Sequence, residues 1–180
     1  MPPVAVTLGT TEQLGPAQLA AGCRLCEVAF AGECFGDEDW RHALGGVHAL
    51  VHDDGRLVAH GALVPRRFLH GGRVLRVGYV EAVAVDPGLR RRGLGSAVMA
   101  ALEESVRRDH DAGALSATDD GAALYAARGW LRWSGTTWAL TPSGRVRTED
   151  DDGSVFVLPG DVGLDVAAEL TCDWREGDLW

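Results

Sequence analysis

The chain has 180 residues, of which 46% are hydrophobic and 24% are charged. This composition is typical of a folded globular protein and excludes a disordered or collagen-like chain. The length suits one domain with its own core and is short for two. No apolar run reaches the roughly 18 residues of a membrane span, and the start of the chain, MPPVAVTLGTTEQ, lacks the features of a signal peptide. We therefore expect a cytoplasmic protein.

Acidic residues gather near one end of the sequence and account for its net charge of -9. Residues 1–148 carry 16 acidic and 16 basic side chains, whereas residues 149–180 carry 10 acidic side chains and one arginine. Such a segment attracts cations and repels polyanions, because nucleic-acid binding depends on clustered positive charge. The sequence therefore favours a cationic partner over nucleic acid.

In the first half of the chain, the spacing of hydrophobic residues predicts strands and helices in a mixed α/β order. We expect strands over 4–8, 47–53, 56–69 and 73–85 and helices over 11–30 and 37–44. Asp54-Gly55 predicts a tight hairpin turn, because this dipeptide accepts the positive φ angles that such turns require. A second turn is expected at Gly71-Gly72.

In the second half, Asp86-Pro87-Gly88 predicts the end of a strand, and a helix opens near Leu94. The apolar residues of this helix recur at helical spacing, so one of its faces should be buried on the sheet. We expect further strands over 113–118, 136–141 and 154–158 and a helix over 121–128, with the strand over 154–158 as the last element.

Cys23 and Cys26 form a single CxxC pair, which on its own is compatible with a zinc site or a redox pair. No second CxxC follows, and both cysteines fall in a predicted helix, so we favour small buried hydrophobic side chains. His48 and His52 would pair on a helix, but their segment has the pattern of a strand that ends in a turn. The sequence therefore predicts no metal site.

The strongest functional signal is the segment from Glu81 to Ser96. An apolar strand, a tight turn, an Arg-x-x-Gly-x-Gly loop over 90–95 and an amphipathic helix follow one another. Together they make a cradle for a pyrophosphate, because glycines let backbone amides approach an anion at a helix N-terminus. A Gly- and Arg-rich helix start without a ligand is the alternative. The loop matches neither the Gly-Lys-Ser/Thr nor the Gly-x-Gly-x-x-Gly nucleotide motif.

Residues 81–101 resemble the acetyl-CoA motif of the GNAT superfamily of N-acetyltransferases. The resemblance implies a single domain over 1–180 with an α/β fold, in which a mostly antiparallel twisted sheet is splayed at a bulge and flanked by helices. It also implies acetyl-CoA as the acetyl donor, without a metal. The implied contacts are Val83 and Val85 to pantetheine, and Arg90, Arg91, Arg92, Gly93, Gly95 and Ser96 to the pyrophosphate. Addition of an extended ligand to an open strand edge is a known mode of recognition.

Further segments along nearly the whole chain look like those of aminoglycoside 2′-N-acetyltransferases. They are FAGE at 30–33, DWRHALGGVHAL at 39–50, GYVEAVAV at 78–85, GALSA at 113–117, LYAARGW at 124–130, DDDGSVFVLP at 150–159 and CDWREGDLW at 172–180. The stretch around 32–40 departs from the family pattern by about one extra residue. This resemblance implies acetylation of an antibiotic's 2′-amino group, a role in antibiotic resistance, and a homodimer.

Acetyl transfer to an amine needs a group that accepts a proton, because an aliphatic amine is mostly protonated at neutral pH. Glu81 is the candidate base, directly or through water, since it is the sole acidic residue in the apolar run 74–85. Regular alternation would place Glu81 on the side of Val83 and Val85, so a bulge is needed to redirect it. By resemblance, Tyr125 is the general acid that protonates the leaving thiolate. The alternatives are a solvent-facing glutamate and a packed aromatic ring.

A polycationic acceptor needs carboxylates that pair with its ammonium groups. By resemblance, the acceptor contacts are Glu33, Asp39, Glu81, Ser116, Asp151, Asp178 and Trp180 with its terminal carboxylate. The run Asp150-Asp151-Asp152 has a solvated turn as its alternative interpretation. Terminal residues fray unless they are held, so a final tryptophan predicts docking onto the fold.

Two other functions remain open from the sequence. The first is a GNAT enzyme for another amine, such as a polyamine, an amino sugar or a peptide N-terminus. The second is a module that binds acetyl-CoA without turnover. The presence of both Glu81 and Tyr125 argues against the second function.

Overall fold

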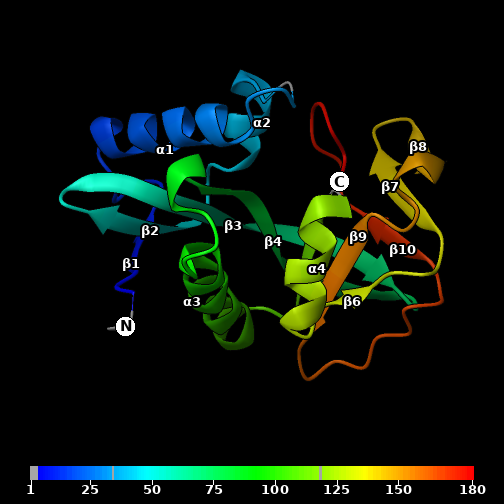
Figure 1. Ribbon diagram of the computed structural model, residues 1–180. Helices are drawn as coiled ribbons and strands as arrows, with labels where there is room; N and C mark the ends of the chain where they lie inside the picture. Colours follow the sequence, from blue (N-terminus) through cyan, green and yellow to red (C-terminus); the bar gives the residue numbers. More distant parts are fainter. Residues whose placement is uncertain (1–3, 34, 118) are drawn as a thin grey trace. The chain divides into compact units, whose positions relative to one another are not determined.

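The computed structural model describes residues 4–33, 35–117 and 119–180. Contacts along the backbone divide the chain into two compact units. Unit 1 comprises Met1–Val64 and Val80–Glu104, and unit 2 comprises Pro65–Tyr79 and Ser105–Trp180. Two long strands, β3 (Arg56–His70) and β4 (Arg73–Val85), contribute to both units (Figure 1).

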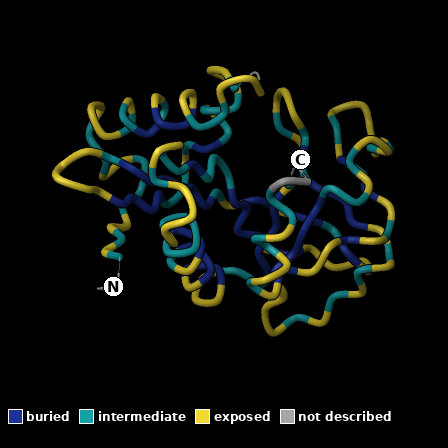
Figure 2. Tube along the Cα trace, viewed as in Figure 1, coloured by how far each residue is buried: buried dark blue, intermediate teal, exposed yellow. Residues whose placement is uncertain are grey.

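Unit 1 contains an antiparallel sheet between helices. β1 (Thr7–Thr10) pairs with β2 (Val47–Asp53), which pairs with the first half of β3. The other elements are α1 (Pro16–Ala29), α2 (Asp37–His42), the short helix η1 (Pro87–Leu89) and α3 (Leu94–Asp109), of which the part up to Glu104 belongs to unit 1. α1 is buried on the side that faces the strands and exposed on the other (Figure 2).

Successive residues of β4 face different helices in unit 1. Ala84 packs with Cys26 of α1. The preceding residue, Val83, lies on the other face: a Cβ atom added to Gly61 of β3 would lie 3.5 Å from Val83 and 2.6 Å from Val98 of α3. This alternation is expected of a strand that is covered on both faces, and it fixes α3 against the sheet.

Unit 2 is a longer sheet with the strand order β6-β9-β5-β4-β3-β10-β7-β8. Its elements are β5 (Ala112–Ser116), α4 (Asp119–Ala127), β6 (Leu131–Arg132), β7 (Thr137–Thr141), β8 (Gly144–Arg147), η2 (Glu149–Asp151), β9 (Val155–Pro159) and β10 (Leu170–Cys172). The pairs β4–β5 and β7–β10 are parallel, and the other registered pairs are antiparallel. Its core includes Phe68, Tyr79, Trp133 and Trp180.

The predicted fold class is confirmed: the chain forms a mixed α/β structure with a mostly antiparallel sheet flanked by helices. Both turns have positive φ angles, 47° and 78° at Asp54-Gly55 and 55° and 75° at Gly71-Gly72. The strand over 73–85 has the predicted bounds. None of the helices within the described residues is long and apolar enough to cross a membrane. The single domain over 1–180 stays a prediction.

Three expectations about individual elements were wrong. The first strand lies at Thr7–Thr10 and not at 4–8, and the first helix begins at Pro16. Proline is favoured at the first helical position, where its missing N–H has no intrahelical partner to lose. The strand over 154–158 is not the last element, because β10 follows it and lies between β3 and β7. β10 has three residues, too few for a hydrophobic period to reveal.

Gly61→Ala is expected to destabilise the protein, because its Cβ would lie 2.6 Å from Cγ1 of Val98 and 3.1 Å from Cδ1 of Leu102. Both of those side chains are fully buried, so they have little room to move. We expect the free energy of unfolding to fall by about 1–3 kcal/mol, measured by chemical denaturation. Gly163→Ala, which meets nothing within 4 Å, is the matched control. Equal stabilities for the two variants would contradict this account of the packing.

Candidate functional site

The loop before α3 forms a concave backbone turn in unit 1. Arg91 and Gly93 have positive φ angles of 61° and 80°, and the amide of Ala97 donates to the carbonyl of Gly93 at 2.9 Å. Gly93 is therefore the residue that precedes the first helical turn. The first N–H groups of a helix have no carbonyl partner within it, so they are available to an anion. No acidic residue lies in the first turn of α3.

The glycines leave this turn accessible. A Cβ at Gly93 would meet nothing within 4 Å, and a Cβ at Gly95 would make only an ordinary contact with Val85 at 3.5 Å. The protein's own packing therefore does not require glycine at position 95. The open backbone and the exposed side chains of Arg91 and Arg92 fit a diphosphate.

Arg90 also has a structural contact. Its guanidinium donates to the carbonyl of Ala29, the last residue of α1, at 2.7 Å. A cation at the C-terminal end of a helix satisfies an unbonded carbonyl and complements the helix dipole. Arg90 thus ties the loop to α1, and the other donors of its guanidinium are available for the predicted anion contact.

β4 changes conformation beside Glu81. Ala82 has a φ angle of 51°, in the left-handed region that residues other than glycine seldom adopt. This residue lies between Glu81 and Val83, which are both half-buried. The registered pairs of β4 with β5 run from Val77 to Tyr79. A departure from regular strand geometry, which the sequence analysis required for Glu81, is therefore present.

Unit 2 gathers a group of acidic and hydroxyl side chains from β5, η2 and the last residues. Burial raises the pKa of Asp151 to about 6, and the nearby Asp178 adds to this increase. The main-chain carbonyl of Asp151 accepts a hydrogen bond from the hydroxyl of Ser154 at 2.8 Å. The hydroxyl of Ser116 donates to Ser154 at 3.2 Å. The structure thus brings together Ser116, Asp151 and Asp178 of the predicted acceptor contacts.

The acidic run 150–152 is not uniform. The ion pair and hydrogen bonds with Arg147 lower the pKa of Asp152 to about 2, and this carboxylate also accepts from Thr137. Asp152 therefore helps to hold β7 and β8 in place. Asp151 has no such basic partner among the causes of its pKa shift. Within this run, Asp151 is the carboxylate that suits a cationic ligand.

Trp180 is docked into unit 2, as the sequence predicted. It is 3% exposed, its indole N–H donates to Thr148 at 2.9 Å, and its ring meets that of Phe68 edge-on with centroids 5.2 Å apart. A main-chain oxygen of Trp180 accepts from Arg175 at 2.9 Å. These contacts hold Trp180 near Asp178, whose carboxylate accepts from the Trp180 amide at 3.4 Å. Its role toward an acceptor stays a prediction.

Tyr125 lies on α4, half-buried against two aromatic rings. The centroids of Trp130 and Phe156 each lie 6.1 Å from that of Tyr125. Burial raises the pKa of the Tyr125 phenol to about 12, so the phenol is neutral at physiological pH. A neutral phenol is the form that can donate a proton.

The other two acidic residues of the predicted site lie in unit 1. Glu33 is exposed in the turn after α1, where its amide donates to the carbonyl of Phe30 at 2.9 Å. The carboxylate of Asp39 accepts from the amide of Gly36 at 2.8 Å, which caps the N-terminus of α2. Sequence reasoning missed this capping role, although three acidic residues at the start of a helix are its usual signal.

The cysteines and histidines of unit 1 make an arrangement that the sequence analysis did not find. Cys26 is fully buried, and burial raises its thiol pKa to about 12. His48 is buried and contacts His60, whereas His52 lies near the end of β2 and is exposed. Within the described residues, no three His, Cys, Asp or Glu side chains converge as metal ligands would. Cys34 lies outside those residues.

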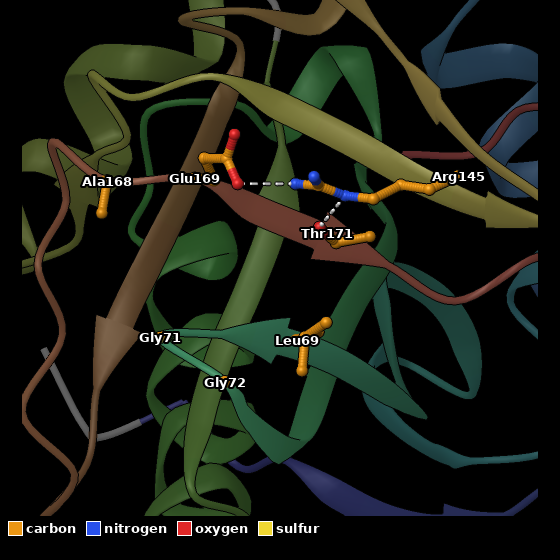
Figure 3. A pocket seen from close by; sticks show the side chains of 7 residues that line it. All are labelled: Leu69, Gly71, Gly72, Arg145, Ala168, Glu169 and Thr171. Carbon is orange, nitrogen blue, oxygen red and sulfur yellow. Dashed lines mark hydrogen bonds and ion pairs between the residues drawn. The ribbon is translucent and has the colours of Figure 1, made fainter.

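Unit 2 also has a pocket of about 330 Å³ that contains none of the predicted site residues (Figure 3). It is lined by Leu69, Gly71, Gly72, Arg145, Ala168, Glu169 and Thr171. Its charged side chains pair with each other, since Arg145 contacts Glu169 at 2.9 Å and also donates to Thr171. The pocket therefore offers no uncompensated carboxylate to a polycation.

Comparison with protein families and known proteins agrees with this geometry. Residues 23–130 match the acetyltransferase (GNAT) family. An aminoglycoside 2′-N-acetyltransferase from Mycolicibacterium fortuitum is 50% identical over 161 residues, which cover 87% of this chain and 82% of the relative. A glucosamine 6-phosphate N-acetyltransferase from Oryza sativa subsp. japonica is 50% identical over 70 residues, or 36% of this chain and 41% of the relative.

Solved structures show the same fold at low sequence identity. Escherichia coli ElaA aligns with a TM-score of 0.61 at 18% identity over 88% of this chain and 99% of its own. The ribosomal-protein-S18-alanine N-acetyltransferase of Escherichia coli aligns with a TM-score of 0.57 at 20% identity, over 88% and 97% of the two chains. On the family match, the relative at 50% identity and the loop before α3, the chain belongs to the acetyltransferase (GNAT) family and is an N-acetyltransferase.

Proposed function

We propose that this enzyme transfers an acetyl group from acetyl-CoA to the 2′-amino group of aminoglycosides. The observation that carries the proposal is the 50% identity to an aminoglycoside 2′-N-acetyltransferase over 87% of the chain. The acidic group formed by Asp151 and Asp178 supports it, because an aminoglycoside carries several ammonium groups that need carboxylate partners.

The donor half of the site would lie at the end of β4 and the start of α3. The amides of the first turn of α3, with Arg90, Arg91, Arg92, Gly93, Gly95 and Ser96, would hold the diphosphate of acetyl-CoA. The backbone groups of Val83 and Val85 would pair with pantetheine. When bound, acetyl-CoA supplies a thioester whose carbonyl carbon is the electrophile. A backbone N–H near Val83 would polarise that carbonyl.

Two side chains would handle protons. Glu81 would accept a proton from the acceptor ammonium, directly or through a water, so that the nitrogen lone pair becomes free to attack in a ternary complex. Tyr125 would protonate the sulfur of the departing thiolate. Burial raises the pKa of Tyr125 to about 12, so at physiological pH the phenol is protonated, which is the form that this role requires.

The acceptor half would use Glu33, Asp39, Ser116, Asp151, Asp178 and Trp180. A second candidate is acetylation of another amino sugar, which the shorter match to glucosamine 6-phosphate N-acetyltransferase favours. The acidic residues argue against a phosphorylated acceptor, since Asp151 and Asp178 would repel its phosphate. Antibiotic resistance, the homodimer and the cytoplasmic location stay predictions.

The position of the acetylated amine is the direct test of the proposed acceptor. Gentamicin and tobramycin carry an amine at the 2′ position, whereas kanamycin A and amikacin carry a hydroxyl there. We expect acetyl-CoA turnover with the first pair only, followed by release of the free thiol and by the mass and NMR spectrum of the product. Equal turnover with both pairs would remove the 2′ assignment. Faster turnover with a simple polyamine than with gentamicin would show that the acceptor class is polyamines and not aminoglycosides.

Glu81→Gln tests the base. We expect kcat to fall by roughly 10²–10⁴-fold near neutral pH, the usual contribution of a general base. The loss should shrink as pH rises, because more of the acceptor amine is then already neutral. Steady-state kinetics with gentamicin between about pH 6 and 9 measure this. Glu38→Gln, an exposed residue of α2, is the matched control. A Glu81→Gln profile parallel to that of the parent at every pH would exclude Glu81 as the base.

Asp151→Asn tests the acidic group through its raised pKa of about 6. In the parent, the Kd for gentamicin should rise as pH falls through about 6, because Asp151 becomes protonated and loses its charge. The variant should bind more weakly than the parent above that pH and differ little from it below. Calorimetric titration at several pH values measures this. Asp150→Asn removes the same charge at the neighbouring residue and should keep a pH-dependent Kd, with its midpoint at a lower pH because Asp150 contributes to the raised pKa of Asp151. A Kd that stays independent of pH in the parent would contradict a role for Asp151.

The raised pKa of Asp151 also predicts how the stability of the protein without acceptor depends on pH. The pKa of Asp151 is higher in the fold than the usual 3.8, so ionisation is disfavoured there. Its contribution to stability therefore falls as pH rises from about 4 to about 6. Asp151→Asn should remove this fall and raise the Tm at pH 7 in the absence of acceptor. An unchanged pH dependence of Tm would show that Asp151 does not titrate in this range.

A further inference from the structure

A chain of hydrogen bonds runs through the interior of unit 1 from Thr11 to β4. The hydroxyl of Thr11 lies 2.8 Å from Nε2 of His48, and Nδ1 of His48 lies 3.0 Å from Nε2 of His60. Nδ1 of His60 lies 2.9 Å from the carbonyl oxygen of Ala82. The two imidazoles are 0% and 1% exposed. The chain ends on the left-handed residue beside Glu81.

The direction of every bond in the chain follows from its last member. A carbonyl oxygen only accepts, so Nδ1 of His60 must carry a hydrogen. If His60 is neutral, its Nε2 has no hydrogen and must accept from Nδ1 of His48. If His48 is neutral as well, its Nε2 accepts from the hydroxyl of Thr11 at 2.8 Å, a shorter contact than the 3.5 Å from that hydroxyl to the carbonyl of Gly46. The Thr11 hydroxyl itself accepts from the amide of Gly45 at 2.9 Å. One arrangement of protons therefore satisfies all four groups.

The surroundings keep both rings neutral. Burial lowers the pKa of His60 to about 4 and lowers that of His48 as well, against a small opposing effect of Glu12. The thiol of Cys26 of α1 lies 3.9 Å from Nδ1 of His60 and donates a longer hydrogen bond of 3.7 Å to the Ala82 carbonyl, and its raised pKa keeps it uncharged. From α2, the ring of Trp40 packs on both imidazoles with centroids 5.3 and 6.2 Å away. No carboxylate is among these direct contacts to stabilise an imidazolium.

The packing around the pair leaves His60 little freedom. A Cβ at Gly22 of α1 would lie 2.8 Å from the ring of Trp40 and 3.4 Å from Cδ2 of His60. α1 therefore approaches closely enough to seat both rings. Ala82 has a left-handed conformation, which is unfavourable for a residue with a Cβ. Such a conformation persists only where the surrounding structure holds it.

We propose that His60, oriented by His48, is a positioning residue that holds the Ala82 carbonyl and so fixes the backbone on which Glu81 and Val83 lie. This inference rests on the proposed function of those two residues. A rigid bond at Ala82 would keep the carboxylate of Glu81 and the amide of Val83 in one geometry. Catalysis is sensitive to such placement, since a shift of about 1 Å can lower a rate by roughly 10²-fold.

Two substitutions at the same position separate this role from bulk stability. The amide nitrogen of asparagine occupies nearly the place of Nδ1 of histidine, so His60→Asn can still donate to Ala82, whereas His60→Leu cannot. Both variants lose the bond from His48 and should lower the Tm. We expect kcat to fall by at least about 10-fold in His60→Leu, with the KM for the amine changed by less than about 3-fold. In His60→Asn, kcat should stay within about 3-fold of the parent.

A purely structural role predicts a different pattern. In that case the two variants would lose activity in proportion to their loss of Tm, and that result would overturn the proposal. Retention of full kcat in His60→Leu would overturn it as well. If His60→Leu does not fold, His48→Leu provides the second variant, because it leaves His60 in place and removes the bond that orients its ring, together with the bond to Thr11. We expect kcat to fall in this variant as well, and an unchanged kcat would overturn the role of His48.

NMR tests the proton arrangement without any assay of activity. Long-range ¹H–¹⁵N spectra of the parent at pH 7 should show His48 and His60 as neutral rings with the hydrogen on Nδ1. The amide signals of Ala82 and Val83 should move in His60→Leu and stay near their parent positions in His60→Asn. A cationic ring, or a hydrogen on Nε2 of His60, would refute the inference. Absence of aminoglycoside turnover by the parent would refute the proposed function alone and leave these signals to decide the role of His60.

Discussion

The backbone of β4 leaves regular strand geometry at Ala82, and the placement of the residues proposed for chemistry depends on that departure. In an undisturbed strand, Glu81 would share a face with Val83 and Val85. The left-handed conformation at Ala82, with a φ angle of 51°, is a departure from that geometry between Glu81 and Val83. Four residues beyond Ala82, Asp86 ends the strand by accepting from the amide of Gly88 and pairing with Arg56. Only a short segment therefore separates the end of β4 from the start of α3 at Leu94.

In unit 1, the backbone of β4 and the loop before α3 are each held by contacts with other elements. Its polar interior, from Thr11 through His48 and His60, ends on the carbonyl of Ala82. Its loop before α3 has open backbone at Gly93 and is tied to α1 by Arg90. Buried polar groups of this kind are costly unless each is hydrogen-bonded, so a fully satisfied chain favours one arrangement of the strand.

In unit 2, acidic residues that look alike in the sequence have different environments. Asp152 pairs with Arg147, and Asp173 pairs with Arg66, whose guanidinium also holds the carbonyl of Leu179. These carboxylates contribute to the structure around Trp180. Asp151 is half-buried beside Asp178, and its raised pKa reflects that burial first. The excess of acidic residues in this part of the chain therefore combines structural ion pairs with a group suited to a cation.

The sequence by itself determined several features of this protein. They are the hairpin turns at 54–55 and 71–72, the bounds of β4, the loop that opens α3 and the docking of Trp180. Each of these depends on neighbouring residues or on a side chain too large and apolar to leave in water. Only the tertiary structure decided the insertion of β10, the raised pKa of Asp151 and the contact of His60 with Ala82. The physical reason is that strand pairing, burial and the His60 contact depend on groups distant in sequence, which hydrophobic spacing does not report.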